Sequence, residues 1–155
     1  MAHTDFKKVS DIRLNKMDAR RTLANAIERS STFTLCYPTG LGNAATTTIL
    51  GVVKDDCEFI GGHFIVNTDV SGDPANVVIK KDSDADPSNG TAISASLAVN
   101  DSAAAIKTLT ATTDDSELVD AGSSIGITVD GDGLAADSIV GLVLYFKLVD
   151  NVDNS

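Results

Sequence analysis

The chain has 155 residues, of which 43% are hydrophobic and 5% aromatic, and its formal net charge is −10. This length and apolar fraction predict one domain with a core of its own and exclude a disordered polypeptide. We expect no export signal and no membrane partner, because the N-terminus lacks an apolar segment and no apolar run is long enough to span a bilayer.

The charge is divided unevenly along the chain. Residues 1–30 contain seven basic and four acidic side chains, a net charge of +3, whereas the remainder contains five and eighteen, a net charge of −13. The acidic remainder would repel nucleic acid and anionic membranes, so we expect neither as a partner. For the basic segment, the charge split favours an acidic protein surface, such as a neighbouring copy of the chain.

Residues 11–29 carry a helical pattern. Ser10 and Asp18 are alternative N-caps, and one apolar stripe recurs at a spacing of four: Ala19, Leu23 and Ile27. A helix this short is marginal alone, so we expect it to lean on another surface. We therefore predict a basic N-terminal arm with a short helix, residues 1–30, and an acidic body, residues 31–155.

From residue 31 the hydrophobic period changes to two, the period of a strand. Short β-branched segments alternate with clusters of Gly, Asn, Asp and Pro, which predicts an all-β sandwich or barrel. No helix long enough for a parallel crossover is indicated, although AVNDSAAAIK is compatible with a helical turn. We predict eight or nine strands, drawn from STFTLCY, TTTILGVV, CEFI, HFIVN, NVVIKK, TAISASLAV, AIKTLTAT, SIGITVD and SIVGLVLYFKLV.

The last of these segments is almost continuously apolar, which indicates a central strand or a contact between subunits. Cys36 and Cys57 are the two cysteines. Without an export signal we expect two buried thiols, with a disulfide as the open alternative. His3 and His63 are too far apart for a structural zinc site.

Two stretches match catalytic or cofactor motifs without their structural context. GLGNAA, residues 40–45, matches a dinucleotide loop, but the β-branched TTTILGVV that follows is a poor helix. GSSIG places Ser124 in a nucleophile motif, yet the predicted strand follows the serine and no histidine lies downstream of His63. Both are better interpreted as turns. We predict no catalytic residue, no cofactor and no enzyme.

The stretch KKDSDADPSNGT places three aspartates on alternate positions, as a calcium loop does. An EF-hand loop requires glycine at its sixth position and glutamate at its twelfth. In a loop that starts at Asp82, these positions hold Pro87 and Ile93. We therefore interpret the stretch as a polar strand connection and predict no metal site. A weaker calcium site of another kind stays open, as does a cation site that includes Asp130 and Asp132 of DGDG.

Several segments together resemble the head-decoration, or cement, proteins of tailed bacteriophages. The resemblance covers residues about 57–149 and rests on EFIGGHFIVNTDVSG, NVVIKKD, NGTAIS, AAIKTLTAT, LVDAGSSIGITVDGDG and SIVGLVLYFKLV. It implies an antiparallel β-sandwich or jelly-roll body, a homotrimer, and a non-enzymatic structural protein of the virion on the capsid exterior.

The same resemblance implies the major capsid protein and further copies of this chain as partners. In such families an N-terminal arm commonly reaches over the capsid or a neighbouring subunit. The arm residues expected to make this contact are Lys7, Lys8, Arg13, Lys16, Arg20, Arg21, Leu23, Ile27 and Arg29. The alternative function is a phage fibre or carbohydrate-binding or receptor-binding β-sandwich module.

Overall fold

The computed structural model describes residues 32–37, 41, 46–69, 74–100, 104–130 and 137–149. The chain divides into two units, Met1–Ser31 and Thr32–Ser155, and every described residue belongs to the second. The predicted arm and its helix lie outside the described residues. Within the described ranges there is no helix that is long and apolar enough to cross a membrane.

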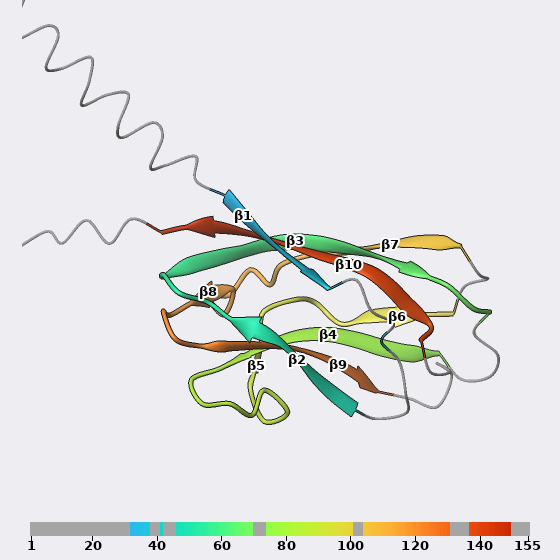
Figure 1. The fold of residues 1–155 in the computed structure, drawn as a ribbon, viewed down its shortest axis with the longest axis horizontal. Coiled ribbons are helices and arrows are strands. Elements are labelled where there is room, and N and C mark those ends of the chain that lie inside the picture. The colour runs from blue at the N-terminus through green and yellow to red at the C-terminus, as the bar shows by residue number, and fades with distance from the viewer. Residues whose placement is uncertain are drawn as a thin grey trace, which may run out of the picture. The chain divides into compact units, whose positions relative to one another are not determined.

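The described secondary structure is a set of β-strands (Figure 1). Alternation of apolar and polar residues produces most of them, as in β1, where Phe33, Leu35 and Tyr37 share the half-buried side. The strands are β1 (Thr32–Tyr37), β2 (Thr46–Val52), β3 (Cys57–Val66), β4 (Ala75–Asp82), β5 (Thr91–Ala92), β6 (Leu97–Val99), β7 (Ala105–Leu109), β8 (Leu118–Val119), β9 (Ser124–Asp130) and β10 (Ile139–Leu148).

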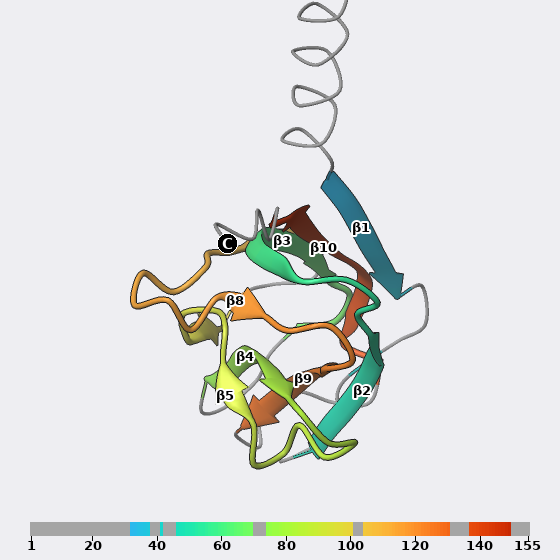
Figure 2. The same cartoon turned by 90° about the vertical axis from the view of Figure 1, so that its left-hand side faces the viewer.

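The strands form two antiparallel sheets packed face to face. Sheet A has the order β1-β10-β3-β7, with β8 also paired to β3. Sheet B has the order β2-β9-β4-β5, with β6 also paired to β4. The edge strands β1 and β2 lie at the same side of the sandwich (Figure 2). The predicted antiparallel β-sandwich is confirmed.

The topology is that of a jelly roll. Because β5 and β6 share one partner strand, and β7 and β8 share another, each pair acts as one interrupted strand. Four strand positions then remain in each sheet, and the chain passes repeatedly from one sheet to the other. Eight antiparallel positions interleaved in this way form two Greek keys. The strand β10 lies between β1 and β3, which confirms its prediction as a central strand.

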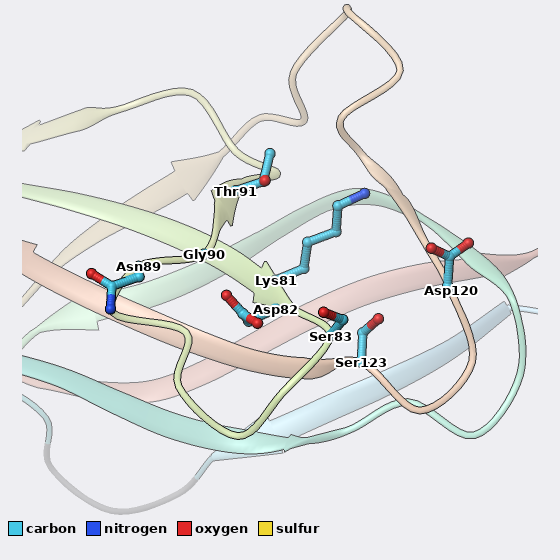
Figure 3. Close-up of a pocket in the computed structure, with 8 residues that line it drawn as sticks. All are labelled: Lys81, Asp82, Ser83, Asn89, Gly90, Thr91, Asp120 and Ser123. Carbon is cyan, nitrogen blue, oxygen red and sulfur yellow. The ribbon is translucent and has the colours of Figure 1, made fainter.

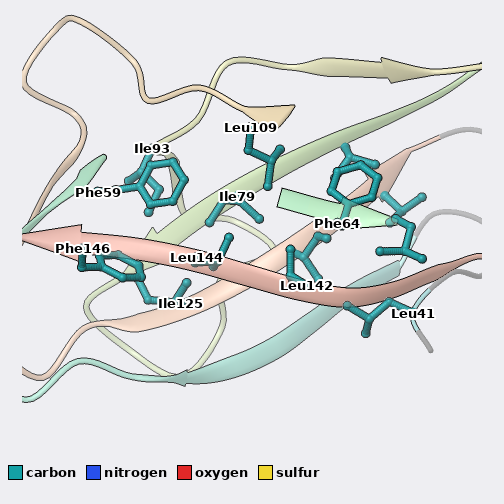
Figure 4. Packing of buried hydrophobic residues seen from close by; sticks show 14 of the residues in the cluster. Leu41, Phe59, Phe64, Ile79, Ile93, Leu109, Ile125, Leu142, Leu144 and Phe146 are labelled. Carbon is teal, nitrogen blue, oxygen red and sulfur yellow. The ribbon is translucent and has the colours of Figure 1, made fainter. Parts of the chain in front are cut away.

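The core fills the space between the two sheets (Figure 4). Phe146 of β10 is fully buried and contacts two other rings: Phe33 is stacked on it at a centroid distance of 5.1 Å, and Phe59 is tilted against it at 5.4 Å. Ile125 and Leu144 are also fully buried. Each such side chain contributes about 1.5–3 kcal/mol when it leaves water, so the body holds itself together without a disulfide.

One predicted strand boundary is wrong. We expected Gly61 and Gly62 to separate CEFI from HFIVN, but both glycines lie inside the continuous strand β3. They serve close approach and bulging rather than a turn. A Cβ on Gly62 would lie 2.6 Å from the carbonyl oxygen of Val143, and Gly61 has a φ of 140° where the register to β10 shifts.

The segment TAISASLAV was predicted as one strand and forms two, β5 and β6. The interruption falls at Ser94, whose Oγ accepts a hydrogen bond from the Ile79 backbone N at 2.9 Å. The side chain therefore satisfies a backbone donor of β4 and interrupts the ladder there. The short strand β8 was missed, because two residues are too few to show a period of two.

Candidate interaction surface

The loop between β4 and β5 contains the three alternating aspartates. Each carboxylate accepts a hydrogen bond from the backbone N–H two residues later. Asp84 N donates to Asp82 Oδ1 at 2.9 Å, and Asp86 N to Asp84 Oδ1 at 2.8 Å. Ser88 N donates to Asp86 Oδ1 at 3.2 Å. These are successive Asx turns, so the spacing that suggested a calcium loop is the spacing of this turn.

The same arrangement recurs in the loop between β7 and β8. Ser116 donates to Asp114 Oδ1 from its backbone N, at 3.3 Å, and from its hydroxyl. These hydrogen bonds lower the pKa of the Asp114 carboxyl. Across the described residues, no group of three histidine, cysteine or acidic side chains is placed to hold a metal ion. The aspartates described in these two loops act as turn formers.

Pro87 fastens the first of these loops to the outer face of sheet B. Pro87 is buried, and a Cβ added to Gly126 of β9 would lie 2.6 Å from its Cγ. The ring thus packs directly on the glycine backbone. Ser124 Oγ donates a hydrogen bond to the carbonyl oxygen of Asp84 at 2.7 Å and holds the loop from a second point.

A polar pocket of about 220 Å³ lies between this loop and the turn that precedes β9 (Figure 3). It is smaller than most ligand sites, which occupy roughly 300–1,000 Å³. Lys81 extends across it and donates from Nζ to the backbone carbonyl of Leu118. No histidine lines the pocket to activate its serines as nucleophiles, and its lysine, Lys81, donates to the Leu118 carbonyl.

The motif candidates are placed in strands and strand connections. Ser124, the centre of GSSIG, is buried at the first residue of β9, and a strand follows it where a nucleophile elbow requires a helix. Of GLGNAA only Leu41 is described; its backbone bonds Ile139 in both directions at 2.7 Å. The segment after it forms β2, as predicted, and not a nucleotide-binding helix.

The two cysteines are free and differ in environment. Cys57 is buried, whereas Cys36 is exposed on the outer side of the edge strand β1, so the prediction of two buried thiols is wrong for Cys36. Burial, with the nearby Asp56 and Asp55 carboxylates, raises the pKa of Cys57 to about 11. Reactivity follows thiolate character and access, so Cys36 is the reactive thiol.

The predicted contact residues of the arm are outside the described residues. This applies to Lys7, Lys8, Arg13, Lys16, Arg20, Arg21, Leu23, Ile27 and Arg29.

The outer face of sheet A carries exposed side chains of low polarity on β1, β3 and β7 and half-buried ones on β10. The register pairs Cys36 with Val143, and Ile65 with Ile106. Ile106 is 73% exposed and Ile60 is 46% exposed. We call this surface the sheet-A face and define it by Cys36, Ile60, Ile65, Ile106, Val143 and Tyr145.

One polar side chain at the sheet-A face has its partners within the sheet. His63 lies at its centre, opposite Val143 in the register. Its Nδ1 is 3.2 Å from Thr108 Oγ1, and its ring meets Tyr145 edge-on at a centroid distance of 5.6 Å. Covering the His63 ring therefore costs less than burying an imidazole without these contacts.

Acidic groups are concentrated outside sheet A. Glu58 is the only acidic residue within its described strands, and Lys147 Nζ lies 3.6 Å from its carboxylate. Asp55 precedes β3 at one end of the sheet, and Asp137 precedes β10 at the other; both are exposed. The sheet-A face is thus a neutral apolar surface between acidic ends.

Part of this surface was detectable in the sequence. The apolar run of β10 indicated either a central strand or a subunit contact, and β10 is central and also supplies Val143 and Tyr145 to the face. Ile65 and Ile106 were missed as surface residues. Alternation alone shows that two sides of a strand differ, and it does not show which side faces solvent when both carry apolar residues.

No protein-family model matches the chain, and no curated protein sequence matches it. Among the solved structures that are similar in fold are a chain of a phage capsid and a chain of another virus. A chain from the capsid of Ralstonia phage GP4 has a TM-score of 0.48 at 15% identity, with 78% of this chain and 85% of that chain covered. A chain from infectious bursal disease virus, Gx strain, has a TM-score of 0.40 at 15% identity, with 79% and 33% covered. Likenesses of this strength do not bear on function.

Proposed function

We propose that this protein binds the outside of an assembled bacteriophage capsid and stabilises it, acting as a homotrimer with the major capsid protein as its partner. The jelly-roll topology is compatible with this function, since viral capsid domains and lectins both use it. Topology alone does not choose among functions. The resemblance of residues about 57–149 to phage decoration proteins supports a capsid-binding function.

The observation that carries the proposal is the sheet-A face. A body with a net charge of −13 repels other acidic surfaces over most of its extent. On the sheet-A face, however, the one acidic group within the strands is paired with Lys147. Ile106 remains 73% exposed there. Apolar surface of this kind marks a site for protein contact, and association through it brings no like charges together.

In the proposed mechanism the protein acts as a staple. The bodies associate with one another, and the basic arms of residues 1–30 contact the shell or a neighbouring subunit. Several weak contacts made at once by one oligomer raise the overall affinity far above that of each contact. The acidic loops point outward and limit clumping of virions through charge repulsion.

Co-sedimentation tests this function. Shells assembled from the major capsid protein of the same genome are mixed with the full chain, pelleted, and assayed for bound protein. We expect saturable binding to assembled shells and loss of binding by a chain that lacks residues 1–30. A full chain that stays in the supernatant would overturn the function. Undiminished binding of the truncated chain would remove the arm from the mechanism.

A second candidate function is a receptor-binding or carbohydrate-binding module. The polar pocket between the β4–β5 loop and the turn before β9 is the feature that favours it. No aromatic side chain lines this pocket, although sugar-binding sites commonly stack the sugar on one. A glycan array with and without calcium separates the two functions, because a decoration protein binds none of the glycans.

A further inference from the structure

We propose that the sheet-A face of one copy receives the basic N-terminal arm of a neighbouring copy, residues 1–30. The inference deepens the proposed function and rests on it, because it names the contact that would hold the oligomer together. Two observations lead to it: an uncovered apolar face between acidic ends on the body, and an arm sequence with the complementary properties.

The apolar parts match in kind. The arm has a stripe of Ala19, Leu23 and Ile27 at a spacing of four, and a helix with so narrow a stripe needs another surface to be stable. The sheet-A face offers exposed isoleucines on adjacent strands, with Ile65 directly opposite Ile106. An amphipathic helix placed with its apolar side on such a surface buries both.

The charges match as well. The arm carries +3, and its basic residues lie mostly off the stripe, where they remain available to acidic groups beside the face. Exposed Asp55 and Asp137 mark the two ends of sheet A. A second body offers no such match, since its net charge is −13 whereas that of the arm is +3.

An exchange of arms also fits a closed oligomer. An arm that binds the face of the next copy uses two different surfaces, so the contact is heterologous and closes into a ring when the rotation permits. Each copy then donates one arm and receives one. The arm enters β1 at Thr32, in the same sheet that provides the face.

Cys36 provides a built-in reporter. It lies on the sheet-A face opposite Val143 and is exposed, whereas Cys57 is buried. Covering the face by an arm slows modification of Cys36 by a soluble disulfide such as DTNB. If about nine-tenths of the faces are occupied, the reaction slows about tenfold, because only the open fraction reacts.

The first test compares reaction rates of Cys36 in shell-free protein. We expect Leu23→Asp/Ile27→Asp to react about tenfold faster than the unmodified chain, since two charges on the stripe prevent docking. The control Ala24→Asp/Asn25→Asp adds the same charge at positions that a helix places off the stripe. It is expected to react as slowly as the unmodified chain. Equal rates in all three proteins would overturn the proposal.

The face is tested with a matched pair of variants. Ile60→Thr/Ile106→Thr removes apolar surface from the sheet-A face, and Ile49→Thr/Val52→Thr does the same on β2, where these side chains are 50% and 65% exposed. Because all four positions are exposed, both variants should fold, which thermal melting checks. Only the first is expected to dissociate in sedimentation velocity and to expose Cys36. An equal effect of both would contradict a specific face.

A mixing experiment separates a neighbouring arm from the chain's own arm. The first chain carries Leu23→Asp/Ile27→Asp and keeps Cys36 as the reporter. The second carries Ile60→Thr/Ile106→Thr and Cys36→Ser and keeps an intact arm. Addition of the second chain should slow the reaction of Cys36 in the first, and a second chain that also lacks the stripe should not.

Absence of slowing in the mixture would overturn exchange between copies. Protection in the unmodified chain that persists on dilution would do the same, because it indicates that each arm covers its own body. None of these measurements contains shells, so the proposal can fail while shell binding holds. Protection of Cys36 with no shell binding would instead overturn the proposed function alone.

Discussion

At the scale of single residues, the aspartates and glycines of the body are explained by local geometry. Asp82, Asp84 and Asp86 each bond the backbone two residues on, and Gly126 leaves room for the Pro87 ring. The sequence predicted aspartate as a turn former, and the structure confirms this in the β4–β5 loop. Contact between Pro87 and Gly126 was not predictable, because it joins positions far apart in the chain.

The Asx turns predict how the loop responds to substitution. Asp84→Asn keeps an oxygen that accepts the Asp86 N–H, so we expect the free energy of unfolding to stay within about 0.5 kcal/mol. Asp84→Ala removes the acceptor and is expected to increase cleavage of residues 82–90 by a protease. Limited proteolysis of the two variants measures this difference.

Calcium should have no specific effect on the loop, because its carboxylates serve the turns. We expect the melting temperature to be the same in calcium chloride and in EDTA at equal ionic strength. A rise with calcium that disappears in Asp84→Asn would contradict this explanation of the aspartates.

The packing of Pro87 on Gly126 predicts a coupled pair. Gly126→Ala places a methyl group against the ring and should destabilise the protein by about 1–3 kcal/mol, the usual cost of overpacking. With Pro87→Gly in the background, the ring is absent and the same substitution should cost clearly less. A double-mutant cycle by urea denaturation measures the coupling, and additive effects would show that the two residues do not interact as described.

At the scale of elements, the sequence predicted most strands because period two and turn residues mark them. It failed where a strand is defined by its neighbours. The glycine pair at 61 and 62 belongs inside β3 since β10 approaches there, and β8 exists because β3 offers a free partner edge. Such features depend on tertiary contacts, which a local pattern does not contain.

Sheet A should tolerate substitutions on its outer side but not on the side that faces the core. Leu144 is fully buried between the sheets, so Leu144→Ala should lower the free energy of unfolding by about 2–5 kcal/mol. Ile106→Ala on β7, which pairs with β3 in the same sheet, changes a side chain that is 73% exposed and should alter the free energy of unfolding by less than about 0.5 kcal/mol. Urea denaturation at low protein concentration measures both. Similar costs would contradict the assignment of inner and outer sides.

At the scale of the whole molecule, the charge split follows the division between the jelly-roll body, which is acidic, and the N-terminal arm, which is basic. The acidic loops surround a body whose sheet A has a neutral apolar face, and the basic residues are concentrated in the arm. The sequence predicted the split and the fold class. The face itself became visible only when the strands were placed side by side, because its residues come from β1, β10, β3 and β7.

Heat release of the packaged genome tests the central claim most directly. Capsids that lack this protein are heated with and without added full chain, and DNA release is followed with an intercalating dye. We expect the added chain to raise the release temperature saturably, and Leu23→Asp/Ile27→Asp to raise it less. If the release temperature is the same with and without the full chain, a capsid-stabilising role is contradicted.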